Sequence, residues 1–482
     1  MTRPTPPDPY PDGITESAPA SVDDQVLRAF AEVGVPFSVD PVERAEHGRD
    51  WWPLSLATTQ RGVVPHWPGV VLTPHSTAQV RDAVRVAARL GLAITAQGGR
   101  SGVLGGAVAP TGGVALDLTG LDRVLDLDRI SGTVSTEAGI FGPDLERAVN
   151  AEGFTVGHFP QSFDLATVGG WLACRGAGQY SNRYGKIEDI VRGLTVVLAS
   201  GDVVTLGGRG PRQAVGPDLV QLFVGSEGSF GVITEATLVL RPRPAHERRL
   251  ALRVSDFDAG MEICRMTLQR DAHPAVLRLY DEVESKRNFD VDGCVLVVLD
   301  EGEPLMVDAT MTVLRDVARD AETLDVGVVA RWLEHRNDVS ALAPLWASNI
   351  VVDTIEVSGP WSILTAVREA ALSALRSVES TLVASVHQSH AYVDGACLYF
   401  TFAGKPAGDP LDYYRAAWDA ATTAVLDKGA ALSHHHGVGR NRSRFVRRAL
   451  GDGFDVLGAL KGLLDPADVL NPGVLGLGGE PW

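Results

Sequence analysis

Cysteine is scarce in this sequence: among 482 residues only Cys174, Cys264, Cys294 and Cys397 carry a thiol. The four positions are far apart and form no Cys-x-x-Cys pair, so a disulfide framework is not expected. Such scarcity is typical of a reducing compartment, and we therefore expect a cytoplasmic protein.

Long apolar runs and an excess of basic charge are also absent. No stretch of 18 apolar residues occurs, so we expect no transmembrane segment. The first 20 residues are rich in Pro and acidic side chains and lack the apolar centre of a signal peptide, and we expect disorder there. The formal net charge of −17 argues against a nucleic-acid partner, but it leaves room for a local basic pocket that binds an anionic small molecule.

The order of strands and helices predicts several domains. A β/α pattern begins near Trp67, and the next apolar stretch with helical spacing has Ser76 as its N-cap and Gly91 as its stop. The turn Ser200–Asp202 joins two apolar strands and predicts a hairpin. The composition changes near Pro242, and from there to about residue 425 we expect an α+β domain.

Glycine is concentrated in three segments between residues 95 and 240. The first, TAQGGRSGVLGGA at 95–107, follows a predicted strand. Glycine lets backbone N–H groups approach an anion closely, so this loop favours a pyrophosphate cradle over the alternative, a glycine-rich surface turn. Its spacing is neither GxGxxG opening a helix nor GxxxxGK[ST], which excludes Rossmann and P-loop sites. Two further segments, at 160–191 and 225–240, suit a long dinucleotide that lies along all three.

The order of these segments resembles the FAD-binding domain of the vanillyl-alcohol-oxidase (PCMH-type) superfamily. The resemblance rests on the GGRSG loop, TVGGWLACRGAG, YGKIEDIV and GSEGSFGVITEATLVLRPRP. Within that superfamily, GHFPQSFDLATVGGW, LRLYD and LSHHHGVGR are most similar to segments of the alkyldihydroxyacetonephosphate synthases, which are ether-lipid flavoenzymes. The similarity runs from about residue 60 to 475, with gaps in the second domain.

This resemblance implies an α+β fold in four parts. Residues 1–60 would form an N-terminal extension with short helices, and 61–244 a PCMH-type FAD-binding domain of two α+β subdomains. Residues 245–425 would form an α+β cap domain that binds substrate, and 426–482 a segment that returns to the FAD domain and completes the active site. Many relatives attach FAD through a histidine in the first glycine-rich loop. That loop has none here, because Arg100 precedes Ser101, so we expect non-covalent FAD.

The same resemblance assigns the cofactor contacts to the three glycine-rich segments. The first segment would bind the pyrophosphate, the second would line the flavin and its ribityl chain, and the third would complete the site. The residues carried over are Thr95, Ala96, Gln97, Gly98, Gly99, Arg100 and Ser101; Gln161, Ser162, Thr167, Gly170, Cys174, Arg175, Gly176 and Ala177; and Glu227, Gly228, Gly231, Val232 and Ile233.

Three of the twelve histidines are consecutive, His434, His435 and His436 in SHHHGVGR. Imidazoles bind zinc, so a metal site is one alternative. Some metal-binding relatives, however, have a Glu where this chain has His435. In the upstream segment SHAYVDGACLYF the chain has only His390, with Tyr399 where another His is expected. We therefore predict no metal. A polar structural loop is a second alternative, and the favoured interpretation is a cluster that holds an anionic substrate and moves protons.

Two further residues match functional positions of the ether-lipid family. Tyr399, in the alternating strand ACLYFTF, matches the proposed proton acceptor or donor, with core packing as the alternative. Arg278, in VLRLYD, matches a functionally important arginine, with a strand-edge salt bridge as the alternative. One departure concerns the substrate: gap-free alignment on Pro360-Trp361 puts Leu342 where the family has a substrate-binding arginine, and Arg336 lies nearby out of register.

The resemblance implies an FAD-dependent enzyme that exchanges an acyl for an alkyl group. In that reaction flavin N5 attacks the substrate, the acyl group leaves and an alcohol takes its place. Tyr399 would move the proton next to the carbonyl, while His434–His436 orient the anion. The alternatives are an oxidoreductase that takes hydride from a hydroxy acid or alcohol, and a flavin-binding protein without catalysis. We expect a small or lipid-like anionic substrate, and the sequence leaves a homodimer open.

Overall fold

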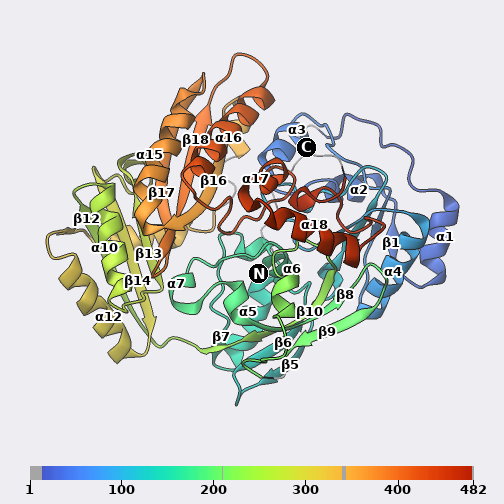
Figure 1. The fold of residues 1–482 in the computed structure, drawn as a ribbon, viewed down its shortest axis with the longest axis horizontal. Helices are drawn as coiled ribbons and strands as arrows, with labels where there is room; N and C mark the ends of the chain where they lie inside the picture. Colours follow the sequence, from blue (N-terminus) through green and yellow to red (C-terminus); the bar gives the residue numbers. More distant parts are fainter. Residues whose placement is uncertain (1–12, 209, 339–342, 480–482) are drawn as a thin grey trace.

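The computed structural model describes residues 13–208, 210–338 and 343–479, so Leu342 lies outside the described residues. Figure 1 shows an α+β architecture, as predicted, with the strands and helices of residues 246–427 (β12 to α16) on one side and the earlier part of the chain on the other, where the last helices (α17 and α18, residues 446–464) also lie. Within the described residues, no helix combines the length and the apolar character needed to cross a lipid bilayer.

The first sheet has four strands in the order β1-β2-β4-β3, of which the last three are parallel. Helix α4 begins after Ser76, whose side chain accepts from the Gln79 N–H, and ends at Gly91 with φ +64°, as the sequence predicts. The elements of this part are α1 (Asp24–Glu32), β1 (Phe37–Ser38), α2 (Pro41–His47), α3 (Pro53–Thr59), β2 (Val70–Leu72), α4 (Thr77–Leu90), β3 (Ile94–Gln97) and β4 (Val114–Asp117).

The expected disorder of the first 20 residues is wrong for the described part, residues 13–20. The buried Arg44 guanidinium donates to the backbone carbonyls of Pro19 and Ala20, and the Thr15 N–H donates to Gly62 O at 2.9 Å. A buried guanidinium needs acceptors, and this segment supplies them through its backbone rather than through its own side chains.

The second sheet has five antiparallel strands in the order β5-β6-β10-β8-β9. The predicted hairpin is present: β8 and β9 pair in register on either side of the turn at Gly201, where φ is +79°. The elements are β5 (Val124–Asp128), β6 (Thr133–Glu137), α5 (Gly142–Ala151), β7 (Phe154–Thr155), α6 (Val168–Ala173), α7 (Ser181–Tyr184), α8 (Ile187–Ile190), β8 (Val191–Val197), β9 (Val203–Gly207), α9 (Leu219–Phe223), β10 (Val232–Val239) and β11 (Arg241–Pro242), which pairs with β7.

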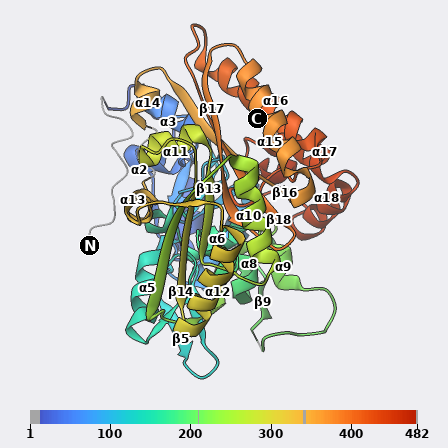
Figure 2. The ribbon, with the colours of Figure 1, turned by 90° about the vertical axis from the view of Figure 1, so that its left-hand side faces the viewer.

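The third sheet has seven strands in the order β15-β12-β14-β13-β17-β18-β16. Helices α10, α12, α15 and α16 cover one face, while α11 and α13 pack against the other. Figure 2 shows α10 and α12 beside strands β13 and β14. The elements are β12 (His246–Val254), α10 (Phe257–Gln269), β13 (Val276–Tyr280), α11 (Glu282–Phe289), β14 (Cys294–Gly302), α12 (Pro304–Val317), β15 (Glu322–Thr323), α13 (Gly327–His335), α14 (Ala343–Ala347), β16 (Val351–Pro360), α15 (Trp361–Ser377), β17 (Thr381–Ala391), β18 (Gly395–Gly404) and α16 (Pro410–Asp427).

Strand register in this third sheet places polar side chains in a row. Leu279, Val386 and Phe400 belong to the buried core under the helices. Because side chains alternate along a strand, the residues next to these three in sequence point to the opposite face of the sheet. Cross-strand pairing then puts His387 opposite Tyr399, and Tyr399 opposite Glu356.

The end of the chain returns to the first sheet. After α17 (Val446–Leu450) and α18 (Gly453–Leu464), the Ile94 N–H donates to Val469 O and the Asn471 N–H donates to Ile94 O, both at 2.7 Å. The buried Lys461 ammonium donates to Leu470 O at 2.7 Å and to the Asp465 carboxylate at 2.6 Å. This segment therefore lies against the strand that leads into the first glycine-rich loop (Figure 1).

Candidate active site

The first and second glycine-rich segments are in direct contact. A Cβ placed on Gly98 would lie 2.1 Å from Thr167 Oγ1, and one on Gly99 would lie 1.7 Å from Leu165 O. Neither position tolerates a side chain, because the backbone of one loop is seated against the other. Thr167 also caps α6, where its Oγ1 accepts from the Gly170 N–H at 3.3 Å.

The third segment joins the same place. The Glu227 N–H donates to Ala173 O at 2.9 Å. Asn471 ties the loops together: its Nδ2 donates to Glu227 O at 2.7 Å and to Gly106 O at 2.9 Å, while its Oδ1 accepts from Thr95 Oγ1 at 3.2 Å. Sequence analysis missed Asn471, although its position in LNPG, after a helix, is a turn signal.

Each of the three segments holds one non-glycine residue in the left-handed region: Arg100 at φ +51°, Arg175 at +56° and Glu227 at +50°. Such strained backbone concentrates at ligand sites, where the surrounding structure holds it in place. At several glycines nearby an added Cβ would make only ordinary van der Waals contacts, with no atom closer than 3.4 Å, namely Gly102, Gly106, Gly170, Gly176 and Gly228. Strained turns with glycine backbone fit the pyrophosphate and ribityl parts of FAD.

Other predicted cofactor residues serve the protein itself. Gln97 is buried, and its Nε2 donates to His47 O and Ala107 O, which holds the first loop. Gly231 packs against Val196, and Val232 and Ile233 are buried core residues of β10. These three residues support the third loop through packing, and they have no polar side-chain atoms that could bind the cofactor.

The remaining predicted residues lie along the loops. Arg100 Nη1 is 3.9 Å from Asp117 Oδ2. Burial raises the pKa of the Cys174 thiol to about 12, so it is a neutral lining group. Of the others, Gln161 and Arg175 are exposed, Ala96, Ser101 and Ser162 are half-buried, and Ala177 is buried, and their contacts with FAD stay a prediction.

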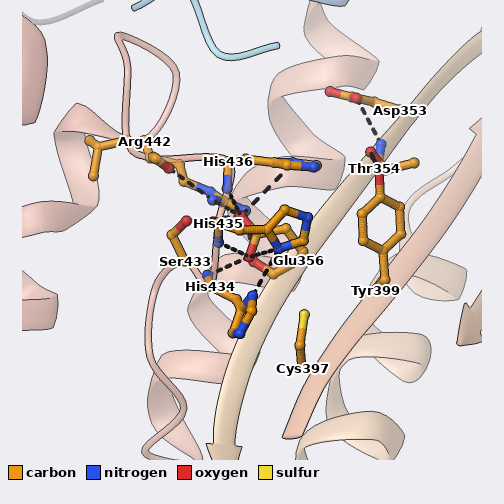
Figure 3. Close-up of polar contacts among 12 residues, drawn as sticks. Asp353, Thr354, Glu356, Cys397, Tyr399, Ser433, His434, His435, His436 and Arg442 are labelled. Atoms are coloured by element: carbon orange, nitrogen blue, oxygen red, sulfur yellow. Dashed lines mark hydrogen bonds and ion pairs between the residues drawn. The ribbon is translucent and has the colours of Figure 1, made fainter. Parts of the chain in front are cut away.

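The histidine run lies outside any helix or strand and wraps around a buried carboxylate, Glu356 of β16 (Figure 3). The backbone N–H groups of all three histidines donate to Glu356, at 3.4 Å for His435 and 2.9 Å for His436. Ser433 Oγ and Arg442 Nη1 donate as well, at 2.8 and 2.7 Å. Arg442 and the nearby imidazoles hold the pKa of Glu356 well below its usual range, although burial opposes them.

The rings of His434 and His435 form a hydrogen-bonded chain with Tyr392. The Nδ1 atoms of His434 and His435 lie 2.9 Å apart, and His434 Nε2 lies 2.8 Å from the Tyr392 hydroxyl. The His390 ring stacks on His434 at 4.8 Å. Burial lowers the pKa of His434 and His435 to about 3 and that of His436 to about 4. The rings are therefore neutral near pH 7, so an anion at this cluster would be held through N–H donation instead of positive charge.

Glu227 connects this cluster to the third glycine-rich segment. Its Oε1 accepts from the Val438 N–H at 2.5 Å and its Oε2 from the Gly439 N–H at 2.8 Å. Burial raises the pKa of Glu227 to about 7. Two carboxyl groups, Glu356 of the third sheet and Glu227 of the third glycine-rich segment, thus fix consecutive halves of the HHHGVG segment.

Tyr399 borders the cluster with its ring but not with its hydroxyl. The ring stacks on His387 at 4.7 Å and meets the edge of His436 at 5.4 Å. The hydroxyl accepts from Thr354 Oγ1 at 3.0 Å (Figure 3), and in the described part of the chain no hydrogen bond links it to the three histidines. Burial raises the pKa of this hydroxyl. Because the Tyr399 hydroxyl is the acceptor in the bond with Thr354, its own hydrogen stays available for donation.

Arg278 and Arg336 flank one indole ring. The two guanidinium carbons lie 5.6 and 5.7 Å from the Trp332 ring centre. Arg278 Nε and Arg336 Nη1 are buried and have no hydrogen-bond partner among the described residues. No described carboxylate forms an ion pair with Arg278, so the strand-edge salt bridge does not occur. The two side chains leave donors free for an anion.

Glu356 is expected to contribute to the stability of the fold. In Glu356→Gln the fully buried Arg442 loses its counter-charge, and breaking such a pair costs about 3–5 kcal/mol. We expect a matching drop in unfolding free energy by denaturant titration, and lower turnover because the histidine backbone loses its anchor. The exposed Glu379→Gln is the control. An unchanged midpoint for Glu356→Gln would contradict this account of the run.

The histidine cluster also contains side-chain atoms that could bind a metal ion, the alternative to a substrate site. Ligand atoms of His390, His434 and His435 lie within 4.8 Å of one another, as do those of Glu356, Cys397 and His435. Both nitrogens of His434 are already engaged by Tyr392 and His435, which weakens it as a ligand. We expect protein purified with a chelator to keep its FAD and its turnover. Activity that returns only after zinc or manganese is added would establish the metal instead.

Comparison with known proteins agrees with these contacts. Residues 68–207 match the FAD binding domain family, and residues 243–475 match the C-terminal domain of the FAD linked oxidases. The alkyldihydroxyacetonephosphate synthase of Caenorhabditis elegans is 28% identical over 497 residues, covering 94% of this chain and 83% of the relative. The FAD-linked oxidoreductase YgcU of Escherichia coli O157:H7, itself named as uncharacterized, is 30% identical over 383 residues, covering 75% and 79%.

Solved structures give the same picture. An alkyldihydroxyacetonephosphate synthase structure superposes with a TM-score of 0.80 at 25% identity, over 96% of this chain and 87% of its own. A p-cresol methylhydroxylase structure superposes with a TM-score of 0.74 at 16% identity, covering 97% of this chain and 99% of its own, and shows the fold alone. The chain is therefore an FAD-dependent enzyme and belongs to the FAD-linked oxidases of the PCMH-type superfamily.

Proposed function

We propose that this enzyme exchanges an acyl for an alkyl group on an anionic substrate, as the name of its synthase relatives suggests. The observation that carries the proposal is one row of side chains across four adjacent strands: Arg278, His387, Tyr399 and Glu356. The row begins with the Arg278 guanidinium, which has no carboxylate partner among the described residues, and it ends at the histidine cluster. Such a row suits a substrate with an anionic head at one end and a reacting carbon near the other.

The arginine end of the row supports binding of the anion. Guanidinium groups present several N–H donors in a plane, which suits a phosphate or a carboxylate. Arg336, whose guanidinium lies over Tyr180 at 5.0 Å and beside Trp332, supplies a second donor next to Arg278. Arg336 would therefore take the role of the substrate-binding arginine that the family has at the position of Leu342.

The other end of the row supports proton movement. Neutral His435 shares one proton with His434, and His434 in turn contacts the Tyr392 hydroxyl, so a proton taken up at one ring has a path along the chain. Tyr399, whose hydroxyl keeps its own hydrogen while it accepts from Thr354, would move the proton next to the substrate carbonyl. When bound, FAD supplies the reactive isoalloxazine ring, and the segments around Gly98, Thr167 and Gly228 would hold it without a covalent link.

Non-covalent binding of FAD can be tested by acid precipitation. We expect the purified protein to be yellow and acid precipitation to release all of its FAD, because the first glycine-rich loop carries Arg100 instead of a histidine. The measurement is flavin absorbance in the supernatant against the pellet. Flavin that stays with the precipitated chain would contradict this prediction.

A second candidate is an oxidoreductase that takes hydride from a hydroxy acid or an alcohol. It is favoured by the relative named as an FAD-linked oxidoreductase and by the grouping of His390, His434 and His435. The same two arginines would then bind a carboxylate. A cytoplasmic location is proposed as well, supported by four free cysteine thiols, and a homodimer stays a prediction.

Product analysis tests the proposal. Purified protein is incubated with an acyl-dihydroxyacetone phosphate and a long-chain alcohol, and the lipids are separated by mass spectrometry. We expect equal amounts of ether product and free fatty acid, both lost in Arg278→Ala. Formation of a keto product from a hydroxy acid, with no ether product, would favour the oxidoreductase.

A further inference from the structure

His387 stands between a carboxylate and a guanidinium. Its Nδ1 lies 2.8 Å from Glu284 Oε2, and its Nε2 lies 2.9 Å from Arg278 Nη2. The three side chains come from different elements, α11, β17 and β13. They form a continuous line from the interior of the cap domain to the arginine at the start of the row.

The chemistry of the partners fixes the proton on the ring. A guanidinium only donates, so His387 Nε2 must carry a lone pair, and the proton must sit on Nδ1, which donates to Glu284. Hydroxyl groups of Ser385 and Thr401 donate to Glu284 Oε1, both at 3.0 Å. The charged form of Glu284 is favoured, because the hydrogen bonds that it accepts and the nearby Arg287 lower its pKa against the effect of burial.

The imidazole is also held on both faces. The Tyr280 ring stacks on it at 5.2 Å and 30°, and the Tyr399 ring on the other side at 4.7 Å and 22°. Only 8% of His387 is exposed. Rotation of the ring is therefore blocked, and the direction of its Nε2 lone pair is set by packing.

This arrangement differs from an ordinary structural arginine. A buried guanidinium that serves stability is normally paired with a carboxylate. Here a neutral imidazole takes that place, while the charge of Glu284 is shared with Arg287, whose Nη2 lies 3.4 Å from it. The positive charge of Arg278 thus stays uncompensated and oriented, as a site for an incoming anion requires.

We propose that Glu284 and His387 are positioning residues that aim the Arg278 guanidinium at the anionic group of the substrate. The inference rests on the proposed function only in taking Arg278 as the anion-binding group. Because Tyr399 stacks on the same imidazole, the pair also sets the spacing between the anion and the reacting end of the row.

Binding of inorganic phosphate to the holoenzyme, measured by calorimetric titration, tests this pair. His387→Phe keeps an aromatic ring between the tyrosines but removes both nitrogens. We expect phosphate affinity to fall roughly 10- to 100-fold, the range found when partners that orient metal-binding histidines are removed, with FAD content unchanged. His387→Gln, which still offers an acceptor to Arg278 and a donor to Glu284, should recover part of the loss. His273→Phe, which removes another carboxylate-paired histidine of the cap domain, is the control and should bind phosphate normally.

The outcomes separate the two ideas. Loss of phosphate binding in Arg278→Ala with full binding in His387→Phe would overturn the positioning inference and leave the anion site standing. Full binding in Arg278→Ala, or none in the wild type, would overturn the anion site itself. Nitrogen-15 NMR of labelled His387 gives a readout that needs no variant fold: we expect protonated Nδ1 and unprotonated Nε2, and the reverse would overturn the inference.

Discussion

Replacing Gly99 by Asp is expected to give a folded protein that purifies without FAD. The Cβ of any side chain here would lie 1.7 Å from Leu165 O, so the first and second glycine-rich segments would have to separate. A carboxylate would also repel the pyrophosphate that the loop is proposed to cradle. We expect near-complete loss of flavin absorbance, measured against protein concentration after gel filtration.

A glycine outside this region provides the control. Gly408 has no atom within 4 Å of an added Cβ and needs no positive φ, so Gly408→Asp should retain full FAD. Circular dichroism distinguishes cofactor loss from unfolding. Stoichiometric FAD in a folded Gly99→Asp protein would remove the first loop from the cofactor site.

Phenylalanine in place of Tyr399 is expected to lower turnover by roughly 10²–10⁴ while leaving flavin content and melting temperature nearly unchanged. The ring keeps its stacking on His387, and only the hydroxyl is lost. If that hydroxyl serves stability alone through Thr354, the change would cost about 1 kcal/mol with little effect on rate. Steady-state kinetics beside thermal melting separate the two cases.

Tyr413 offers a closely matched control. Its hydroxyl also bonds to a threonine, Thr381 Oγ1 at 3.0 Å, but its ring belongs to the core under the helices. Tyr413→Phe should therefore cost the same hydrogen bond without slowing the reaction. Equal kinetic effects of the two substitutions would assign Tyr399 to core packing, the alternative that its strand position first suggested.

Features governed by local rules were predictable from the sequence. The cap at Ser76, the stop at Gly91 and the hairpin at Gly201 depend on residues only a few positions away, and the structure has all three. The glycine-rich segments were predictable for a related reason. Close backbone contact excludes side chains, and that exclusion is written into the sequence as glycine at Gly98 and Gly99.

Features that depend on strand register were not predictable. Glu356 meets the histidine run only because β16 pairs with β18, and the two segments are about 80 residues apart in sequence. Two acidic residues in the otherwise apolar strand 351–359, Asp353 and Glu356, were a signal, since a carboxylate is rarely buried without partners. The signal in the sequence was weaker for His387 and Asn471, because each bonds to groups more than 100 residues away. The Tyr399 hydroxyl was placed by resemblance, which fixes the position of a residue but not its rotamer.

The central claim is that the flavin serves an exchange at an anionic substrate without net reduction. Anaerobic mixing of the purified holoenzyme with an acyl-dihydroxyacetone phosphate, followed by absorbance near the flavin maximum, tests it most directly. We predict an oxidised flavin spectrum throughout, with ether product once a long-chain alcohol is added. Bleaching of the flavin by this substrate alone, or by a hydroxy acid where the acyl compound does nothing, would contradict the claim.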